Sequence, residues 1–236
     1  KPFIEYICSF NKPILISTGA SEMNEIEEAI EWISNFDIKF AVMHCILNYP
    51  TADENANLGM IIDLSHAGKK TCLDTIEISN KPVAISHANP SFFHKSIRNI
   101  DTDVLKKLAS KNGFIGLSLY PYHLKDHGKC EPEDFCEMIK KLINIIGEDN
   151  IGIGSDLCLN WPDEIVMWMR NGKWTKKIDY GESKDKNPKW PELPSWFKQP
   201  SDLKNLFYIL QKNLISEKTI YKILGHNWLE FMKLHF

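Results

Sequence analysis

Two histidines stand at matching places in the sequence and are its clearest candidates for chemistry. His66 follows the apolar run 60–64 and His87 follows the apolar run 82–85, each directly after a serine. Short apolar runs separated by a helix-sized segment are typical of parallel strands buried on both faces. The carboxyl ends of such strands meet on one side of the sheet, where α/β barrels place their active sites. We therefore predict that both histidines lie in one site, although either alone would be interpreted as a strand cap.

Two imidazoles at adjacent strand ends are half of a typical metal site, and the sequence offers further candidates nearby. Arg98 follows the second histidine and could anchor a carboxylate. Asp156 comes directly after the apolar run 151–155, and His44 lies near the end of the run 39–45. Each has a plainer interpretation: a surface ion pair for Arg98, a loop carboxylate or N-cap for Asp156, and a strand cap for His44.

The elements that must position these residues alternate between strands and helices. We predict six strands, near 13–17, 39–45, 60–64, 82–85, 114–119 and 151–155. Helices are expected over 21–33, 69–79 and 101–110, from Pro132 to Gly147, and three times at the end of the chain, with caps at Ser201 and Ser216. Repeated β-α units predict an α/β fold of the (β/α) TIM-barrel type. A complete barrel needs eight strands, so we expect an incomplete one of about six parallel strands.

Composition limits the classes of function. A chain of 236 residues with 43% hydrophobic residues can bury a full core. A net charge of −3 excludes an obvious nucleic-acid or anionic-membrane partner, and no apolar run suggests a membrane span or a signal peptide. The six cysteines are scattered, which predicts free thiols and a cytoplasmic location. The irregular, tryptophan-containing stretch 157–200 predicts a lid or packing over the barrel mouth, and the start at Lys1 rather than Met predicts a missing upstream segment.

The residues around the two histidines resemble the membrane (renal) dipeptidase family of zinc peptidases. The resemblance covers 59–236 and rests on motifs in the family's order: D-L-S-H-A-G at 63–68, P-V-A-I-S-H-A-N-P at 82–90, I-R-N at 97–99, the strand at 113–119, N-I-G-I-G-S-D at 150–156 and G-H-N-W at 225–228. It implies a barrel enzyme in which two zinc ions share a bridging carboxylate and activate water. By this resemblance His66 and His87 are ligands of one zinc, Asp156 handles the proton, and Arg98 pairs with the carboxylate of a dipeptide substrate.

Residues 2–58 resemble a different family, the sialic acid synthases, which condense phosphoenolpyruvate with an N-acyl sugar on a barrel of their own. The resemblance is carried by S-T-G at 17–19 and by H-C…Y-P-T at 44–51, and it implies that His44 is a ligand of a divalent metal. We therefore predict a synthase-like fragment over 1–58 and a dipeptidase-like barrel half over 59–236, together forming one compact unit. A natural fusion, an assembly artefact and an engineered chimera remain open as origins of the join.

The dipeptidase pattern is incomplete in ways that concern its metals. The family's first strand supplies a His-x-Asp pair, which occurs nowhere in this sequence, and no predicted strand contains the bridging glutamate. We therefore expect at most one zinc per chain, held by His66 and His87 with His44 as a further candidate. Three hypotheses follow: a zinc-dependent dipeptidase, which we favour; a synthase-like enzyme; and a non-catalytic metal-binding remnant. Because six strands leave two sheet edges open, we also expect homo-oligomers.

Overall fold

A computed structural model describes residues 2–18, 21, 23–44, 61–159 and 190–234. The six predicted strands are confirmed in type and order. They are β1 (Ile14–Ser17), β2 (Phe40–His44), β3 (Ile61–Ile62), β4 (Ala84–Ala88), β5 (Phe114–Leu117) and β6 (Ile151–Ile153). The helices are α1 (Pro2–Cys8), α2 (Met23–Ser34), α3 (Lys69–Ile78), α4 (Thr102–Ser110), α5 (Pro132–Ile146), α7 (Leu203–Lys212), α8 (Glu217–Tyr221) and α9 (Asn227–Lys233). Short turns complete the described part: η2 (Pro121–His123), η3 (His127–Lys129), η4 (Pro200–Asp202) and η5 (Lys222–His226).

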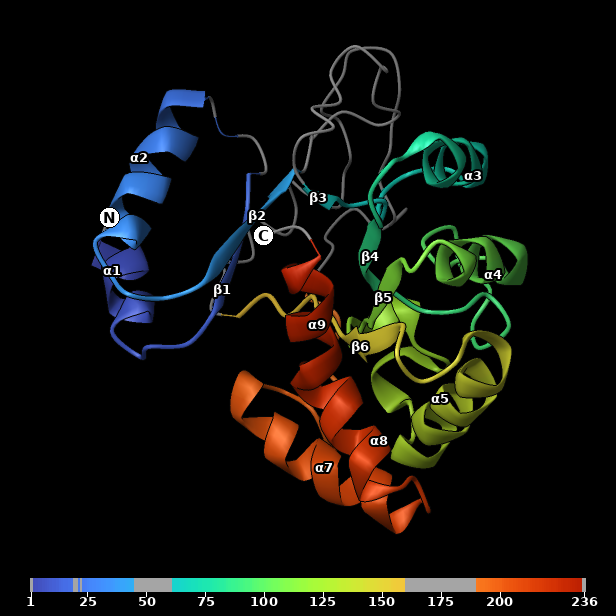
Figure 1. The fold of residues 1–236 in the computed structure, drawn as a ribbon. Coiled ribbons are helices and arrows are strands. Elements are labelled where there is room, and N and C mark those ends of the chain that lie inside the picture. Colours follow the sequence, from blue (N-terminus) through green and yellow to red (C-terminus); the bar gives the residue numbers. More distant parts are fainter. Residues whose placement is uncertain (1, 19–20, 22, 45–60, 160–189, 235–236) are drawn as a thin grey trace.

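All strand pairs among the described residues are parallel, and they form two three-stranded sheets in the orders β1-β2-β3 and β4-β5-β6. The sheets meet where Asp63 pairs with Ala84 in an isolated parallel bridge, and Leu64 N–H donates to the Ala84 carbonyl at 2.8 Å. The strands therefore follow one another in sequence order, as Figure 1 shows. The fold is α/β with parallel strands, and the described strands do not close into a barrel.

Alternation along β5 places side chains in two different packing clusters. Ile115 and Leu117 belong to the larger core cluster, together with buried residues of α3, α4 and α5. Phe114 belongs instead to a second cluster, with Phe231 of α9, and its ring centroid lies 4.2 Å from that of Trp228. The indole N–H of Trp228 donates to the Ile153 carbonyl at 2.9 Å. The last helix thus covers the face of the strands that α3, α4 and α5 leave free (Figure 1).

Several predicted helix signals are confirmed and one is wrong. Pro132 occupies the first turn of α5, Gly147 ends that helix with a φ of 81°, and the Ser216 hydroxyl accepts from the Thr219 N–H as the cap of α8. Ser201 does not cap α7, because it lies inside η4, where Gln199 and Asp202 form the reciprocal capping contacts instead. The body of the predicted lid, residues 160–189, lies outside the described residues. Trp196 at its end packs on Phe135 of α5, and the choice between a lid and packing over the barrel mouth stays open.

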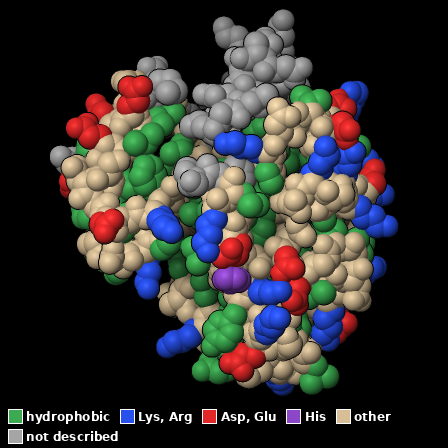
Figure 2. Space-filling model, in the orientation of Figure 1, with side chains coloured by type: hydrophobic (Ala, Val, Ile, Leu, Met, Phe, Trp, Pro, Cys, Tyr) green, Lys and Arg blue, Asp and Glu red, His purple; other side chains and the backbone are tan. Residues whose placement is uncertain are grey.

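No helix in the described part of the chain has both the length and the apolar character needed to cross a membrane. The five cysteines of the described residues are all free thiols, as predicted. Charges of both signs cover the side of the molecule formed by α3 and α4, whereas apolar side chains gather beside α2 (Figure 2). On the face that Figure 2 shows, the two sides of the molecule therefore differ in character.

Candidate functional site

The two predicted histidines come together at the junction of the two sheets. His87 lies within β4, and His66 lies in the turn that follows β3. Their Nε2 atoms are 2.8 Å apart, and the ring centroids are separated by 4.9 Å at an angle of 60° between the planes. The bridge between the end of β3 and the start of β4 sets this approach, because it aligns the two strand ends. The structure thus brings the two Ser-His pairs together, and their role as a functional site stays a prediction.

Asp63 ties the two Ser-His segments together, and sequence reasoning did not select it. Its Oδ1 accepts from the Ser65 N–H at 3.1 Å, the Ser65 hydroxyl at 2.6 Å and the Ser86 N–H at 2.9 Å. Its Oδ2 accepts from the Ser86 hydroxyl. In turn, the His87 N–H donates to the Ser65 hydroxyl oxygen at 3.1 Å. The available signal was the position of an acidic residue just before a Ser-His pair at a strand end.

Arg98 is the third predicted site residue that the structure brings to this place. One of its terminal nitrogens lies 2.9 Å from Nε2 of His66. Its Nε is buried and lacks a hydrogen-bond partner, and no carboxylate of the described residues forms an ion pair with it. Among the described residues, Arg98 therefore does not form the surface ion pair of the plainer interpretation. A guanidinium that faces an imidazole and leaves one donor unmatched is suited to receive an anion.

Burial and positive neighbours lower the pKa of two histidines of this region, His66 and His123. Burial, Arg98 and then His87 and His123 lower the pKa of His66 from 6.5 to about 2. Burial and Arg98 likewise lower the pKa of His123 to about 3. Since a metal binds only the unprotonated nitrogen of an imidazole, these environments favour ligand-competent rings.

His123 is a second residue that sequence reasoning missed. It is 2% exposed, and its Nδ1 lies 2.8 Å from the Ser118 hydroxyl. A buried amide network fixes this segment, because the Asn89 side chain donates to the carbonyls of Ser118 and His123, at 2.9 and 3.1 Å. Asn99 donates to the same His123 carbonyl at 3.0 Å. The Y-P-Y-H segment carried no pattern that would have indicated this burial from sequence alone.

The positions of the protons determine whether His66 and His87 can bind a cation. The Asp63 carboxylate only accepts, so the single Ser86 hydroxyl proton points to its Oδ2. The Ser86 oxygen lies 2.8 Å from Nδ1 of His87 and must then accept from it, which leaves Nε2 of His87 with a lone pair. Because a guanidinium only donates, Nε2 of His66 also presents a lone pair to Arg98. The two nitrogens lie 2.8 Å apart, and a cation bound by both would relieve the repulsion of their lone pairs, with Arg98 giving up its contact with Nε2 of His66.

The donor set therefore fits one zinc ion through two imidazoles, but it supplies little more. Imidazole nitrogens around a tetrahedral zinc stand about 3.3 Å apart, given bonds of about 2.0–2.1 Å, so the two Nε2 atoms, now 2.8 Å apart, would have to separate by about 0.5 Å. No group of three or more His, Cys, Asp or Glu side chains capable of holding a metal occurs among the described residues. Asp156 is therefore not gathered with both histidines; it lies three residues beyond the end of β6 with a φ of 53°. The backbone of His44 ends β2 as predicted, but its side chain lies outside the described residues.

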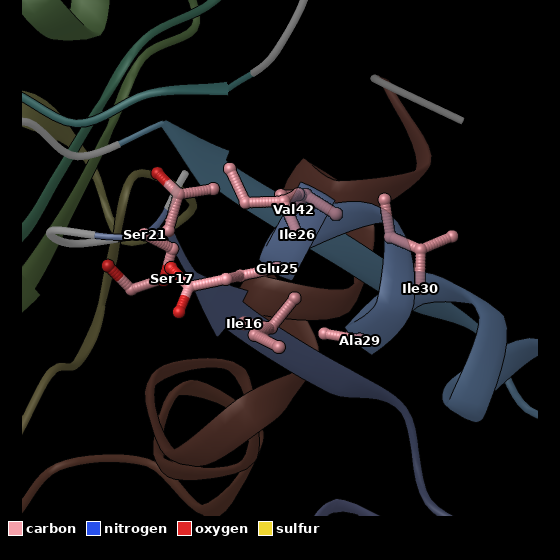
Figure 3. A pocket seen from close by; sticks show the side chains of 9 residues that line it. Ile16, Ser17, Ser21, Glu25, Ile26, Ala29, Ile30 and Val42 are labelled. Carbon is pink, nitrogen blue, oxygen red and sulfur yellow. The ribbon is translucent and has the colours of Figure 1, made fainter. Parts of the chain in front are cut away.

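One small hollow lies elsewhere, between α2 and the strands β1 and β2. Its volume is about 30 Å³, room for about one water molecule, and Ile16, Ile26 and Val42 line it with Ser17 and Glu25 (Figure 3). The side chains that face it are mostly aliphatic and belong to the packing of α2 on the first sheet. It includes none of the predicted site residues.

Comparison with protein families accounts for the two resemblances in the sequence. Residues 52–163 match the membrane dipeptidase family (peptidase family M19), and residues 1–72 match the NeuB family. Different segments of the chain are therefore similar to two different families. The two matches overlap over residues 52–72, and the predicted join near Gly59 falls within that overlap.

Individual relatives agree with the second segment. Dipeptidase tcpJ of Claviceps purpurea is 35% identical over 139 residues, which are 53% of this chain and 33% of that protein. The chain spans only a quarter to a third of the length of the curated relatives it matches. Among solved structures, an amidohydrolase from Pseudomonas aeruginosa is similar with a TM-score of 0.71 and 22% identity, covering 93% of this chain and 79% of that one. A metallopeptidase from Rhodobacter sphaeroides, solved with a phosphinate mimic of the dipeptide L-Ala-D-Ala, is similar with a TM-score of 0.66 and 14% identity. The match covers 100% of this chain and 72% of that one.

Proposed function

We propose that this chain is a zinc-dependent hydrolase of the dipeptidase type, with an incomplete (β/α) barrel whose site lies at the junction of β3 and β4. The observation that carries the proposal is the convergence of His66, His87 and Arg98 at neighbouring strand ends. The dipeptidase match over residues 52–163 includes all three residues and agrees with this choice. Dipeptides or similar small amides are the proposed substrates.

In this proposal each residue of the cluster has a separate task. His66 and His87 hold one zinc ion through Nε2, and a bound zinc would lower the pKa of its water to about 7 and polarise a carbonyl. Arg98 receives the substrate carboxylate, because its buried Nε has no partner and its charge faces no carboxylate among the described residues. Asp156, which follows β6 on the far side of β5 from β4, is the proposed residue for proton transfer.

A specific observation supports a second candidate, a metal-binding remnant without catalysis. Only two imidazoles converge among the described residues, and two ligands make a weak zinc site. The NeuB match over residues 1–72 supplies a third candidate, a condensation that consumes phosphoenolpyruvate. The three candidates differ in turnover, so one set of assays separates them.

The test combines zinc content with turnover in purified protein. We expect at most one zinc per chain after dialysis, and hydrolysis of an L-Ala-D-Ala dipeptide that depends on added zinc. His66→Ala and His87→Ala should each abolish binding and turnover. His226→Ala is the matched control, since that ring is well exposed on η5 and forms an ion pair with Glu230 at 3.9 Å. Zinc binding without hydrolysis would support the remnant, and phosphate release from phosphoenolpyruvate with manganese and an N-acyl sugar would support the synthase.

The role of Arg98 has its own test within the same assay. Arg98→Lys keeps the positive charge but loses the planar pair of donors that binds a carboxylate. We expect KM for the dipeptide to rise at least tenfold with a smaller change in kcat, since a charge-assisted pair contributes roughly 1.5–3 kcal/mol. An unchanged KM would remove Arg98 from substrate binding and leave the zinc site unaffected.

A further inference from the structure

The contacts of Asp63 point to a role beyond structure at the proposed site. We propose that Asp63 is a positioning residue: acting through the Ser86 hydroxyl, it fixes the proton of His87 on Nδ1 and thereby keeps Nε2 available as a ligand. The inference rests on the proposed function for its purpose. Its geometry, however, concerns only residues of the described chain.

The argument begins with the two oxygens of Asp63, which face different partners. Oδ1 receives the backbone N–H groups of Ser65 and Ser86, at 3.1 and 2.9 Å. Backbone N–H groups cannot reverse their direction, so an acceptor must stand at this position. Oδ2 accepts a hydrogen bond from the Ser86 hydroxyl, and the oxygen of that hydroxyl also contacts Nδ1 of His87.

The hydroxyl of Ser86 passes this constraint to the ring. It has one proton, and the carboxylate takes it because a carboxylate oxygen cannot donate. Nδ1 of His87, at 2.8 Å from the same oxygen, must therefore be the donor in the second contact. The series of hydrogen bonds from the carboxylate through the hydroxyl to the imidazole thus selects the His87 tautomer with its proton on Nδ1. Carboxylates that contact metal-binding histidines directly select a tautomer in the same way.

The two serines offer a matched comparison, because both hydroxyls donate to Asp63 but only one touches a ring. The Ser65 hydroxyl donates to Oδ1 at 2.6 Å and accepts from the His87 backbone N–H at 3.1 Å. The Ser86 hydroxyl contacts the His87 ring. Removal of either hydroxyl costs the carboxylate one hydrogen bond, and only the removal of the Ser86 hydroxyl breaks the path to Nδ1.

Asp63→Asn should reverse the tautomer for a definite reason. The amide oxygen must take the place of Oδ1, where two backbone N–H groups point. The amide nitrogen then faces the Ser86 hydroxyl and donates to it, so the hydroxyl proton turns away from residue 63. Nδ1 of His87, at 2.8 Å, is a nearer acceptor for that proton than the Ser65 oxygen, at 3.2 Å. The ring must carry its proton on Nε2, where it blocks the binding of a metal.

The experiment reads the ring protons directly by long-range proton–nitrogen NMR of metal-free, ¹⁵N-histidine-labelled protein, with His87→Ala to assign the signals. We expect a protonated Nδ1 on His87 in the wild type and in Ser65→Ala. We expect a protonated Nε2 in Asp63→Asn, and loss of the Nδ1 preference in Ser86→Ala. Zinc affinity, measured by competition with a chromophoric chelator, should fall about 10–100-fold in the last two variants and stay near the wild-type value in Ser65→Ala.

A bare Nδ1 in the wild type, or an unchanged tautomer in Asp63→Asn, would overturn the proposal. If Asp63→Asn fails to fold, Ser86→Ala against Ser65→Ala decides the question, and equal zinc affinities in the two would overturn it. Failure of the proposed function looks different. The tautomers would then follow the expectation while no dipeptide is hydrolysed.

Discussion

The two sheets are built from the same strand–helix pattern, yet their strands are buried to very different degrees. Every residue of β5 is buried, because α4 and α5 pack on one face and the rings of α9 cover the other. In β1 half-buried residues alternate with exposed ones, and Leu15 is 40% exposed. The apolar side chains beside α2 in Figure 2 belong to this less covered half. An apolar strand pattern therefore predicts the strand but not the elements that cover it.

The largest expected effect contrasts the same substitution in the two sheets. Leu117→Ala in β5 removes a side chain with 0% exposure and should cost about 3–5 kcal/mol of unfolding free energy. Leu15→Ala in β1 should cost about 1 kcal/mol or less, because part of that side chain is already in water. Urea unfolding followed by circular dichroism measures both. Similar losses in the two variants would mean that β1 is covered as fully as β5.

A smaller effect is expected where β5 approaches β4 at the site. A methyl group on Gly116 would stand 2.0 Å from the Ser86 carbonyl oxygen and 3.0 Å from the Trp228 ring. Gly116→Ala should therefore cost about 1–3 kcal/mol and weaken zinc binding, because the Ser86-His87 segment must shift. Gly68→Ala is the control, since nothing lies within 4 Å of the added methyl group. We expect Gly68→Ala to change the free energy of unfolding by less than about 0.5 kcal/mol. Alanine is a poorer N-cap than glycine, but it also lowers the conformational entropy of the unfolded chain, and the two effects oppose each other.

The second half should also dominate the dependence of stability on pH. The pKa of His123 is about 3 in the folded chain and near 6.5 when unfolded, so only the unfolded state gains its proton as pH falls from 6.5 toward 3. The stability that His123 contributes is complete above pH 6.5 and is lost over that interval. In metal-free protein, His123→Asn should reduce the slope between pH 4 and 6 by about 1.4 kcal/mol per pH unit. An unchanged slope in urea titrations across this range would contradict the assignment.

The sequence was sufficient to predict the strands and to select three residues that the structure brings together, and the physical reasons are specific. The period of the apolar runs identified six parallel strands, and the Ser-His repeat placed His66 and His87 at neighbouring strand ends. The network of Asp63 could not be derived, because it depends on the register of β3 against β4, and register is set by the packing of the whole sheet. The burial of His123 likewise depends on amides from two other segments, Asn89 and Asn99.

The caps show the same limit at shorter range. Ser216 was found from sequence because its cap needs only the next turn of the chain. Ser201 was chosen by the same rule and is not a cap. Gln199, two positions before it, and Asp202, one position after it, form the capping contacts at this helix start instead. Where two polar residues compete for one helix start, residue type does not decide which of them caps.

The last and smallest effect on stability concerns the open edge of the first sheet. Among the described strands, β1 pairs only with β2, and such an edge can pair with another copy of the chain. Leu15→Lys places a charge on that edge and should shift the protein toward monomer in light scattering, with unfolding free energy changed by only about 0.5 kcal/mol. Ile97→Lys adds the same charge at a side chain that is 96% exposed and away from the strand, so it should leave the assembly as it is. If the wild-type protein is already a monodisperse monomer, or if the two lysine variants behave alike, the less covered sheet does not drive association. The difference between the sheets would then affect stability alone.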